Sequence, residues 1–72
     1  MLEITPGITV TPQIRFGHPV IRGTRVPVAT VIARIAYGSS FAEVMEEYDL
    51  TREDILNALN YAALRLTDHQ IW

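Results

Sequence analysis

Residues 17–28, with the sequence GHPVIRGTRVPV, constrain the fold of this chain more than any other stretch. Two glycines and two prolines stand at fixed points along it. A helix interior does not use that pattern, because proline lacks an amide donor and glycine weakens a helix. Pairs of β-branched residues lie between them. The stretch therefore predicts a small β-hairpin or arch, with Arg22, Thr24 and Arg25 around its turn.

The chain has 72 residues and is predicted to form one domain, residues 1–72. A chain of this size buries only about 60% of its unfolded surface, so a monomer is marginally stable. Hydrophobic residues make up 49% of the sequence, and no cysteine is present to form a disulfide or a zinc–thiolate site. We therefore expect a homodimer or another complex to complete the core.

The sequence contains no candidate membrane segment. No apolar run approaches the roughly 20 residues that span a bilayer. The N-terminus lacks the basic start and the apolar region of a secretion signal. The expected location is the cytoplasm, with no membrane partner.

We expect a mostly α domain with a short N-terminal β arm or hairpin followed by three helices. Residues 1–26 are predicted to form the extended β arm, residues 27–68 the three-helix bundle and residues 69–72 a tail. In the arm, apolar residues alternate with threonine and proline, and Pro6-Gly7 predicts a turn.

Local signals place the ends of the three helices. The first helix begins at Pro27 or Val28, since proline is favoured at a first helical position, and it ends at Gly38. Ser40 opens the second helix with the pattern of a capping box, and Thr51 caps the third. Apolar residues cover more than half of the third helix, so we expect it to be wrapped from several sides.

The second and third helices have the spacing of a helix-turn-helix. The third helix carries Glu53 and Asp54 at its start, and two carboxylates there repel phosphate. Asn57, Asn60 and Tyr61 are candidates to contact base edges, since asparagine pairs with adenine. The alternative is that they are solvent-facing spacers, in which case this helix is structural.

Charge is divided unevenly along the chain, although the net charge is only −2. Residues 1–42 carry four arginines and one glutamate, whereas residues 43–72 carry two arginines and seven acidic residues. The chain has no lysine, and arginine favours paired contacts with carboxylate or phosphate. The candidate DNA contacts are Arg15, Arg22, Thr24 and Arg25. The alternative is a structural turn whose arginines pair with the glutamates at positions 43, 46 and 47.

No catalytic or metal-binding constellation is present in the sequence. The only histidines are His18 and His69, with no cysteine and no His-Glu-x-x-His spacing. The chain has no glycine-rich phosphate loop, and its acidic cluster lacks the spacing and the glycine of a calcium loop. We therefore expect no enzyme activity, no metal, no cofactor and no small-molecule substrate.

Four segments of the chain resemble a small prokaryotic family described as domain of unknown function 433. Residues 17–28 resemble its signature G-x-P-x-I-x-G-T-R-[IV]-x-V, and residues 32–40, 43–55 and 58–63 resemble three further segments. The likeness covers residues 8–66. One departure is Asp49, which stands where the family has proline, in a shorter turn.

The resemblance implies a homeodomain-like three-helix fold and the role of antitoxin to a small PIN-like ribonuclease toxin. Such a nuclease holds a metal in a carboxylate cluster, which an antitoxin can block with an arginine or cover. Arg34 and Arg65 are the candidate arginines, and Ile71 and Trp72 are the candidate anchors. Alternatively, Trp72 packs on its own domain.

Our leading hypothesis is therefore an antitoxin of a type II toxin–antitoxin pair. It would bind and inhibit the nuclease, and as a dimer it would bind its own operator DNA through the Arg22–Arg25 arm. The alternatives are a stand-alone helix-turn-helix DNA-binding regulator, or a structural dimer or adaptor with neither activity.

Overall fold

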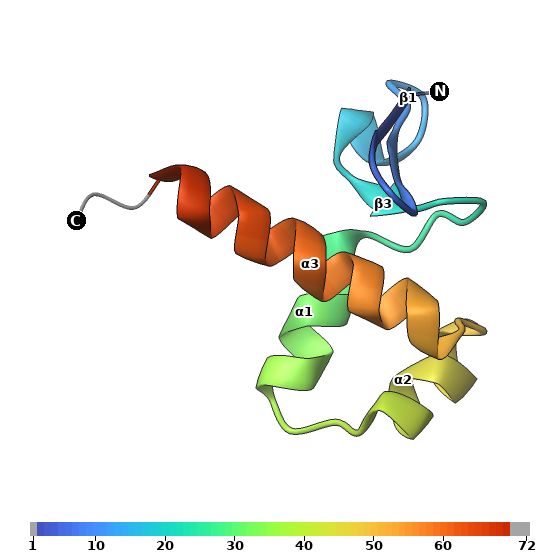
Figure 1. Ribbon diagram of the computed structural model, residues 1–72. Coiled ribbons are helices and arrows are strands. Elements are labelled where there is room, and N and C mark those ends of the chain that lie inside the picture. Colours follow the sequence, from blue (N-terminus) through green and yellow to red (C-terminus); the bar gives the residue numbers. More distant parts are fainter. Residues whose placement is uncertain (1, 70–72) are drawn as a thin grey trace.

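The computed structural model describes residues 2–69 and shows a small sheet followed by three helices (Figure 1). In chain order, the elements are β1 (Leu2–Thr5), β2 (Ile8–Val10), the 3-10 turn η1 (Arg15–Gly17), β3 (Val20–Ile21), α1 (Val28–Ala36), α2 (Phe41–Tyr48) and α3 (Arg52–His69). The sheet is antiparallel, with β2 between β1 and β3. The predicted class, an N-terminal β region followed by three helices, is confirmed.

The arch predicted for residues 17–28 is present and is closed by a threonine. Ile21 donates its amide to the carbonyl oxygen of Val26 at 2.9 Å across the turn. The Thr24 hydroxyl donates to the Ile21 carbonyl oxygen at 2.8 Å and accepts from the Val26 amide at 3.0 Å. Gly23 has φ +78°, a left-handed conformation that costs glycine little. The turn is thus fixed by its own residues.

Side-chain caps begin the second and third helices. The Ser40 hydroxyl accepts from the Glu43 amide at 3.1 Å, and the Glu43 carboxylate accepts from the Ser40 amide at 2.8 Å. Thr51 and Asp54 make the same reciprocal pair at α3, at 3.1 and 3.0 Å. These bonds satisfy amides that the first helical turn leaves unpaired. The predicted caps at Ser40 and Thr51 are confirmed.

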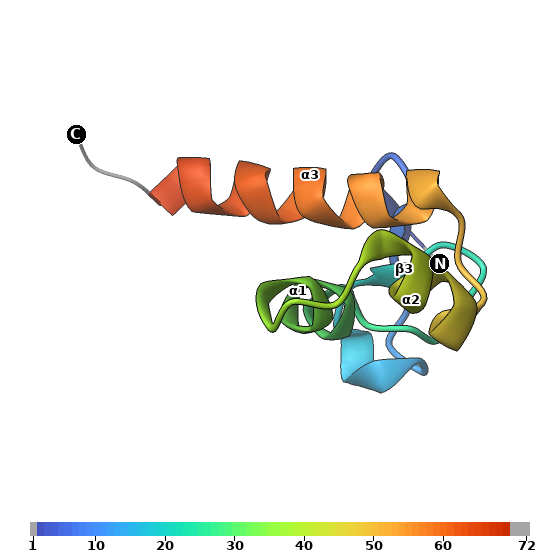
Figure 2. The same cartoon turned by 90° about the horizontal axis from the view of Figure 1, so that it is seen from below.

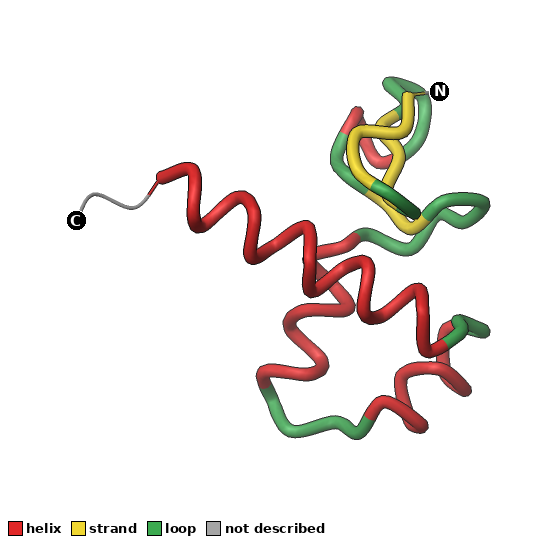
Figure 3. The backbone as a smooth tube through the Cα atoms, in the orientation of Figure 1, coloured by secondary structure: helices red, strands yellow, loops and turns green. Residues whose placement is uncertain are grey.

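One core joins the sheet to the helices. Its fully buried large side chains come from β2, β3 and all three helices: Ile8, Ile21, Val31, Val44 and Ile55. Figure 3 shows the strands on one side of α3, with α1 and α2 on another. Strands β2 and β3 of the predicted N-terminal β region therefore contribute to the core, whereas β1 is largely exposed.

Only the first half of α3 is wrapped by the rest of the chain. Ile55 and Ala58 are buried, whereas Leu64 and Leu66 are 46% and 65% exposed. Figures 1 and 2 show the C-terminal part of α3 projecting beyond the other helices and the sheet. The expectation of a helix covered from several sides is therefore wrong for its second half. No helix among residues 2–69 combines the length and the hydropathy needed to cross a membrane.

Candidate partner-binding groove

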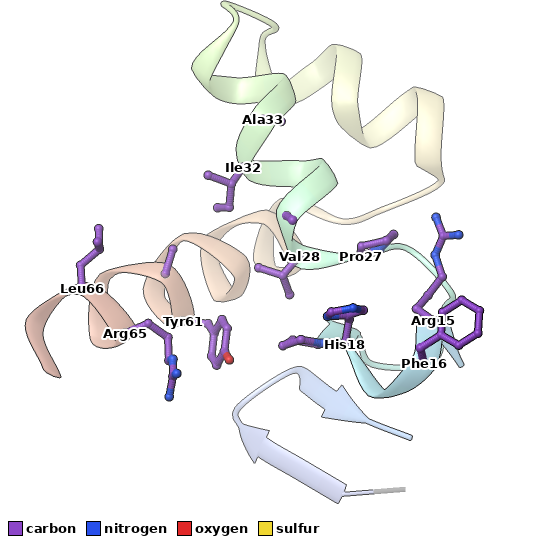
Figure 4. Close-up of a pocket in the computed structure, with 13 residues that line it drawn as sticks. Arg15, Phe16, His18, Pro27, Val28, Ile32, Ala33, Tyr61, Arg65 and Leu66 are labelled. Atoms are coloured by element: carbon purple, nitrogen blue, oxygen red, sulfur yellow. The ribbon is translucent and has the colours of Figure 1, made fainter. Parts of the chain in front are cut away.

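An apolar groove with a volume of about 830 Å³ lies between α1, the second half of α3 and residues 15–19 (Figure 4). Val28, Ala29, Ile32 and Ala33 form the α1 wall, and Tyr61, Ala62, Arg65 and Leu66 form the α3 wall. In each wall the lining residues have the spacing i, i+1, i+4 and i+5, which places them on one face of the helix. The three alanines are short and leave depth between the walls.

Three basic side chains line this groove. Arg15 and His18 come from the segment before β3, and Arg65 comes from α3. Figure 4 shows Arg65 beside Leu66 on one side of the groove, with Arg15 beside Phe16 on the other. Among residues 2–67, no aspartate or glutamate lines it. A partner with acidic groups at the rim is therefore favoured over a basic one.

The η1 turn at the edge of the groove has an unusual backbone. Arg15 and Phe16 have φ +53° and +57°, and Gly17 follows with φ +81°. A left-handed conformation costs a residue with a Cβ roughly 1–2 kcal/mol. The Phe16 side chain is 96% exposed, so burial within this chain does not offset that cost. The sequence does not indicate this turn, because only Gly17 is of a residue type that readily adopts a positive φ.

Three of the four predicted DNA contacts lie together at the β3–α1 turn. Arg22 pairs with Glu3 at 3.1 Å, and the same carboxylate oxygen accepts from the Gly7 amide at 2.8 Å. Its acidic partner is thus Glu3 of β1, whereas the alternative reading had predicted glutamates of the second helix. Thr24 closes the turn and Arg25 is exposed. Arg15 lines the groove instead.

The predicted partner-binding arginines have different surroundings. Arg34 donates to the Glu47 carboxylate at 2.6 Å and to the Ser39 hydroxyl at 3.3 Å, so it ties α1 to α2. The hydrogen bond to Glu47 raises the pKa of Arg34 above its ordinary value. Arg65 lines the groove. Ile71 and Trp72 lie outside the described residues.

The candidate base-reading residues of α3 face different neighbours. A Cβ added at Gly7 would lie 2.3 Å from Nδ2 of Asn57, so Asn57 lies against the β1–β2 turn. Tyr61 lines the groove and packs on the core, whereas Asn60 is exposed. Two of the three side chains therefore contact the protein itself. This arrangement favours the structural interpretation of the third helix.

The chemistry that the groove offers is binding of apolar side chains beside fixed positive charge. Over residues 2–69, no group of three or more histidines and carboxylates is placed to hold a metal ion. Another hollow of the surface has a volume of about 360 Å³. It is bordered by the Glu3–Arg22 pair and by Asn57, whose contacts hold the sheet against α3.

Comparison with known proteins places the chain in a family. The model of a family described as "Protein of unknown function (DUF433)" matches residues 8–62. The chain belongs to the DUF433 family. A DUF433 member protein from Anabaena variabilis ATCC 29413 has a similar crystal structure, with a TM-score of 0.78 and 33% sequence identity. The likeness covers 86% of this chain and 62% of that one.

A curated relative is also similar in sequence. The uncharacterized protein y4eO of Sinorhizobium fredii (strain NBRC 101917 / NGR234) is 45% identical over 56 residues. That match covers 76% of this DUF433 chain and 25% of the relative, so the chain spans about a quarter of the length of y4eO. Arg65 and Leu66 lie beyond residues 8–62, the part that the family model matches.

The structure explains why position 49 is Asp49 and not the proline of the family pattern. Asp49 ends α2 with φ +56°, and the next amide, that of Leu50, donates to the Met45 carbonyl oxygen at 2.9 Å. A proline ring fixes φ near −65°, so proline is incompatible with this turn. The turn into α3 therefore differs from the one that the family's proline implies.

Proposed function

We propose that this DUF433 chain is an antitoxin that binds and inhibits a PIN-like ribonuclease in the cytoplasm. The observation that carries the proposal is the 830 Å³ apolar groove with Arg15 and Arg65 at its edges. An exposed apolar patch rimmed by polar residues is typical of a protein interface. Leu66, one of the residues that line it, is 65% exposed.

Arg65 is the arginine proposed to act on the nuclease. A guanidinium presents five donors in a plane that matches carboxylate oxygens, so it competes for the carboxylates that would hold a catalytic metal. Arg34 is less suited to this task, because it already pairs with Glu47 at 2.6 Å. The groove would supply the apolar contact that holds Arg65 in place.

The test is a binding and inhibition assay with the nuclease that co-purifies from the host. The full chain is expected to form a stoichiometric complex and to suppress RNA cleavage. The double variant Arg65→Ala, Leu66→Ala should weaken the complex by at least about tenfold, a typical loss at the centre of an interface. The matched control is Arg25→Ala, Leu56→Ala, which removes an exposed arginine and a half-exposed leucine that do not line the groove.

Two outcomes would contradict the proposal at different points. If the host yields no nuclease partner, the antitoxin role is wrong. If the complex forms but both double variants bind like the wild type, the groove is not the site.

Operator binding by a homodimer is a second proposed function. Arg22 and Arg25 support it, because both side chains lie at a turn that Thr24 closes and the Arg22 side chain is 63% exposed. The double variant Arg22→Ala, Arg25→Ala should abolish DNA binding and spare the nuclease complex. Wild-type DNA binding should weaken steeply as salt rises. Operator affinity unchanged in the double variant would contradict this role.

A further inference from the structure

We propose that the occupant of the groove is an amphipathic helix of the partner protein, with acidic residues near both of its ends. The inference deepens the proposed function and rests on the groove being a protein-binding site. Its apolar face would lie on α1 and α3, and its acidic residues would lie at Arg15 and Arg65.

The shape of the groove fits a helix. Its long walls are two helix faces, one on α1 with Ile32 and Ala33 and one on α3 with Tyr61 and Leu66 (Figure 4). Ridges of side chains on a third helix pack into such a groove, and an incoming helix supplies anchors at positions i, i+3, i+4 and i+7. A groove of about 830 Å³ accommodates several of these anchors.

The charge of the groove selects among possible occupants. Arg15, His18 and Arg65 line it, and residues 2–67 contribute no acidic side chain to the lining. A second copy in a two-fold arrangement would place these same basic groups opposite one another, and like charges at an interface are unfavourable. Nucleic acid would match the charge, but its backbone is polar and the floor of the groove is aliphatic. An acidic helix with an apolar face matches both properties.

The η1 turn gives the groove an aromatic contact at its edge. Phe16 has φ +57° and a side chain that is 96% exposed. Strained backbone of this kind persists where surrounding structure holds it, and it is frequent at ligand clamps. Aromatic residues, phenylalanine among them, and arginine are enriched at protein interfaces. Phe16 is therefore expected to pack on the bound helix.

The experiment uses the full chain and two labelled synthetic peptides. Both peptides are helices of about four turns with the same leucine stripe. One carries glutamates at both ends and the other carries lysines. Fluorescence anisotropy should show that the acidic peptide binds at least about tenfold more tightly than the basic one, because two rim charges change from attraction to repulsion.

A charge exchange in the protein tests the site itself. Arg15→Glu with Arg65→Glu should reverse the preference, so that the basic peptide binds more tightly. Arg25→Glu with Arg52→Glu makes the same change in net charge at residues outside the lining, and it should leave the preference unchanged. The melting temperature of each variant, followed by circular dichroism, confirms that the variants are folded.

An aromatic pair tests the edge of the groove. Phe16→Ala should weaken binding of the acidic peptide by about tenfold. Tyr37→Ala is the matched control, since Tyr37 is 88% exposed and does not line the groove. That variant should bind like the wild type.

The results that overturn the inference are distinct. Equal binding of the two peptides, or no binding of either up to about 1 mM, excludes an acidic helix as the occupant. A homodimer in sedimentation that Leu66→Glu dissociates would assign the groove to a second copy. If the charge-exchanged chain still inhibits the nuclease fully, the inference fails and the antitoxin role stands. If the acidic peptide binds as expected and no nuclease partner exists, the antitoxin role fails and the inference stands.

Discussion

The two halves of α3 form one continuous helix but have different surroundings. In the first half, Ile55 and Ala58 have no exposed surface and belong to the core. In the second half, Leu64 and Leu66 are 46% and 65% exposed. The comparison teaches that apolar residues of one helix can have two different surroundings. The first half stabilises the fold, whereas the second half leaves apolar side chains that this chain does not cover.

The second half of α3 remains helical without a core beneath it for reasons of local energetics. Once Thr51 and Asp54 have capped the first turn, each further residue adds a hydrogen bond at little cost. Residues 62–66 are alanine, leucine and arginine, the residue types with the highest helix propensity. The apolar residues there are therefore free to serve binding.

Substitution of one apolar residue in each half tests this comparison most directly. Ile55→Ala should lower the free energy of unfolding by about 3 kcal/mol, because it leaves a cavity in the core. Leu66→Ala should lower it by less than about 0.5 kcal/mol, as is usual for exposed positions. Urea unfolding measures both. Equal losses for the two variants would mean that the second half also stabilises the isolated chain.

The contact between the β1–β2 turn and the packed half of α3 gives the next largest effect. Gly7 has φ +79°, and an added Cβ would lie 2.3 Å from Nδ2 of Asn57. Gly7→Ala should therefore cost about 2 kcal/mol, from the strained backbone together with the clash. In an Asn57→Ala background the cost should fall to about 1 kcal/mol, since the clash with the amide is removed, and the backbone strain and a 3.2 Å contact with Cβ of position 57 remain. Additive effects of the two substitutions would contradict the contact.

How far the sequence predicts the molecule depends on the range of the interactions. Pro27, Ser40 and Thr51 predicted the helix starts, because caps act between residues three or four apart. The groove joins segments that are distant in sequence, so the sequence indicates Arg15 only as a candidate DNA contact and does not indicate the groove. Arg34 could not be distinguished from Arg65, because its pairing with Glu47 depends on how α1 packs against α2.

The covered and uncovered faces of α3 also could not be distinguished from the sequence. Its apolar pattern is the same whether its own chain or a partner covers it. The left-handed backbone of Arg15 and Phe16 could not be predicted from the sequence for a related reason. Neither residue type favours that conformation, which is imposed by the surrounding fold.

A substitution in the capping box of α2 tests whether the stability of the fold and binding in the groove are independent, and its expected effect on stability is smaller. Ser40→Ala should lower the free energy of unfolding by about 1 kcal/mol, the usual loss for a helix cap. Peptide binding in the groove should be unchanged, because Ser40 is not among the lining residues. Urea unfolding and anisotropy on the same samples test both halves of this prediction.

The same capping box predicts a dependence on pH. The hydrogen bond that the Ser40 amide donates to the Glu43 carboxylate, together with one from the Ser40 hydroxyl, holds the pKa of Glu43 below its ordinary value. The stability from this carboxylate is therefore present above its unfolded-state pKa, and it is lost as the pH falls through the lower folded-state pKa. Glu43→Gln keeps an acceptor without the titration, so its stability should decline less in acid. Identical acid profiles for the two chains would exclude this role of Glu43.

The smallest predicted effect lies at Asp49, in the turn that leads the chain into the packed half of α3. Asp49 has φ +56°, and Leu50 and Met45 complete a helix end of the type that usually carries glycine at this position. Asp49→Gly should raise the free energy of unfolding by about 0.5 kcal/mol, because relief of the left-handed backbone slightly exceeds the added freedom of the unfolded chain. Asp49→Ala should lower it, since alanine lacks the local hydrogen bonding that makes aspartate tolerant of this conformation. A free energy of unfolding that decreases in the order Gly, Asp, Ala at position 49, measured with urea, would establish that backbone strain determines this turn. A lower free energy of unfolding with glycine than with aspartate would mean that the carboxylate itself stabilises the turn.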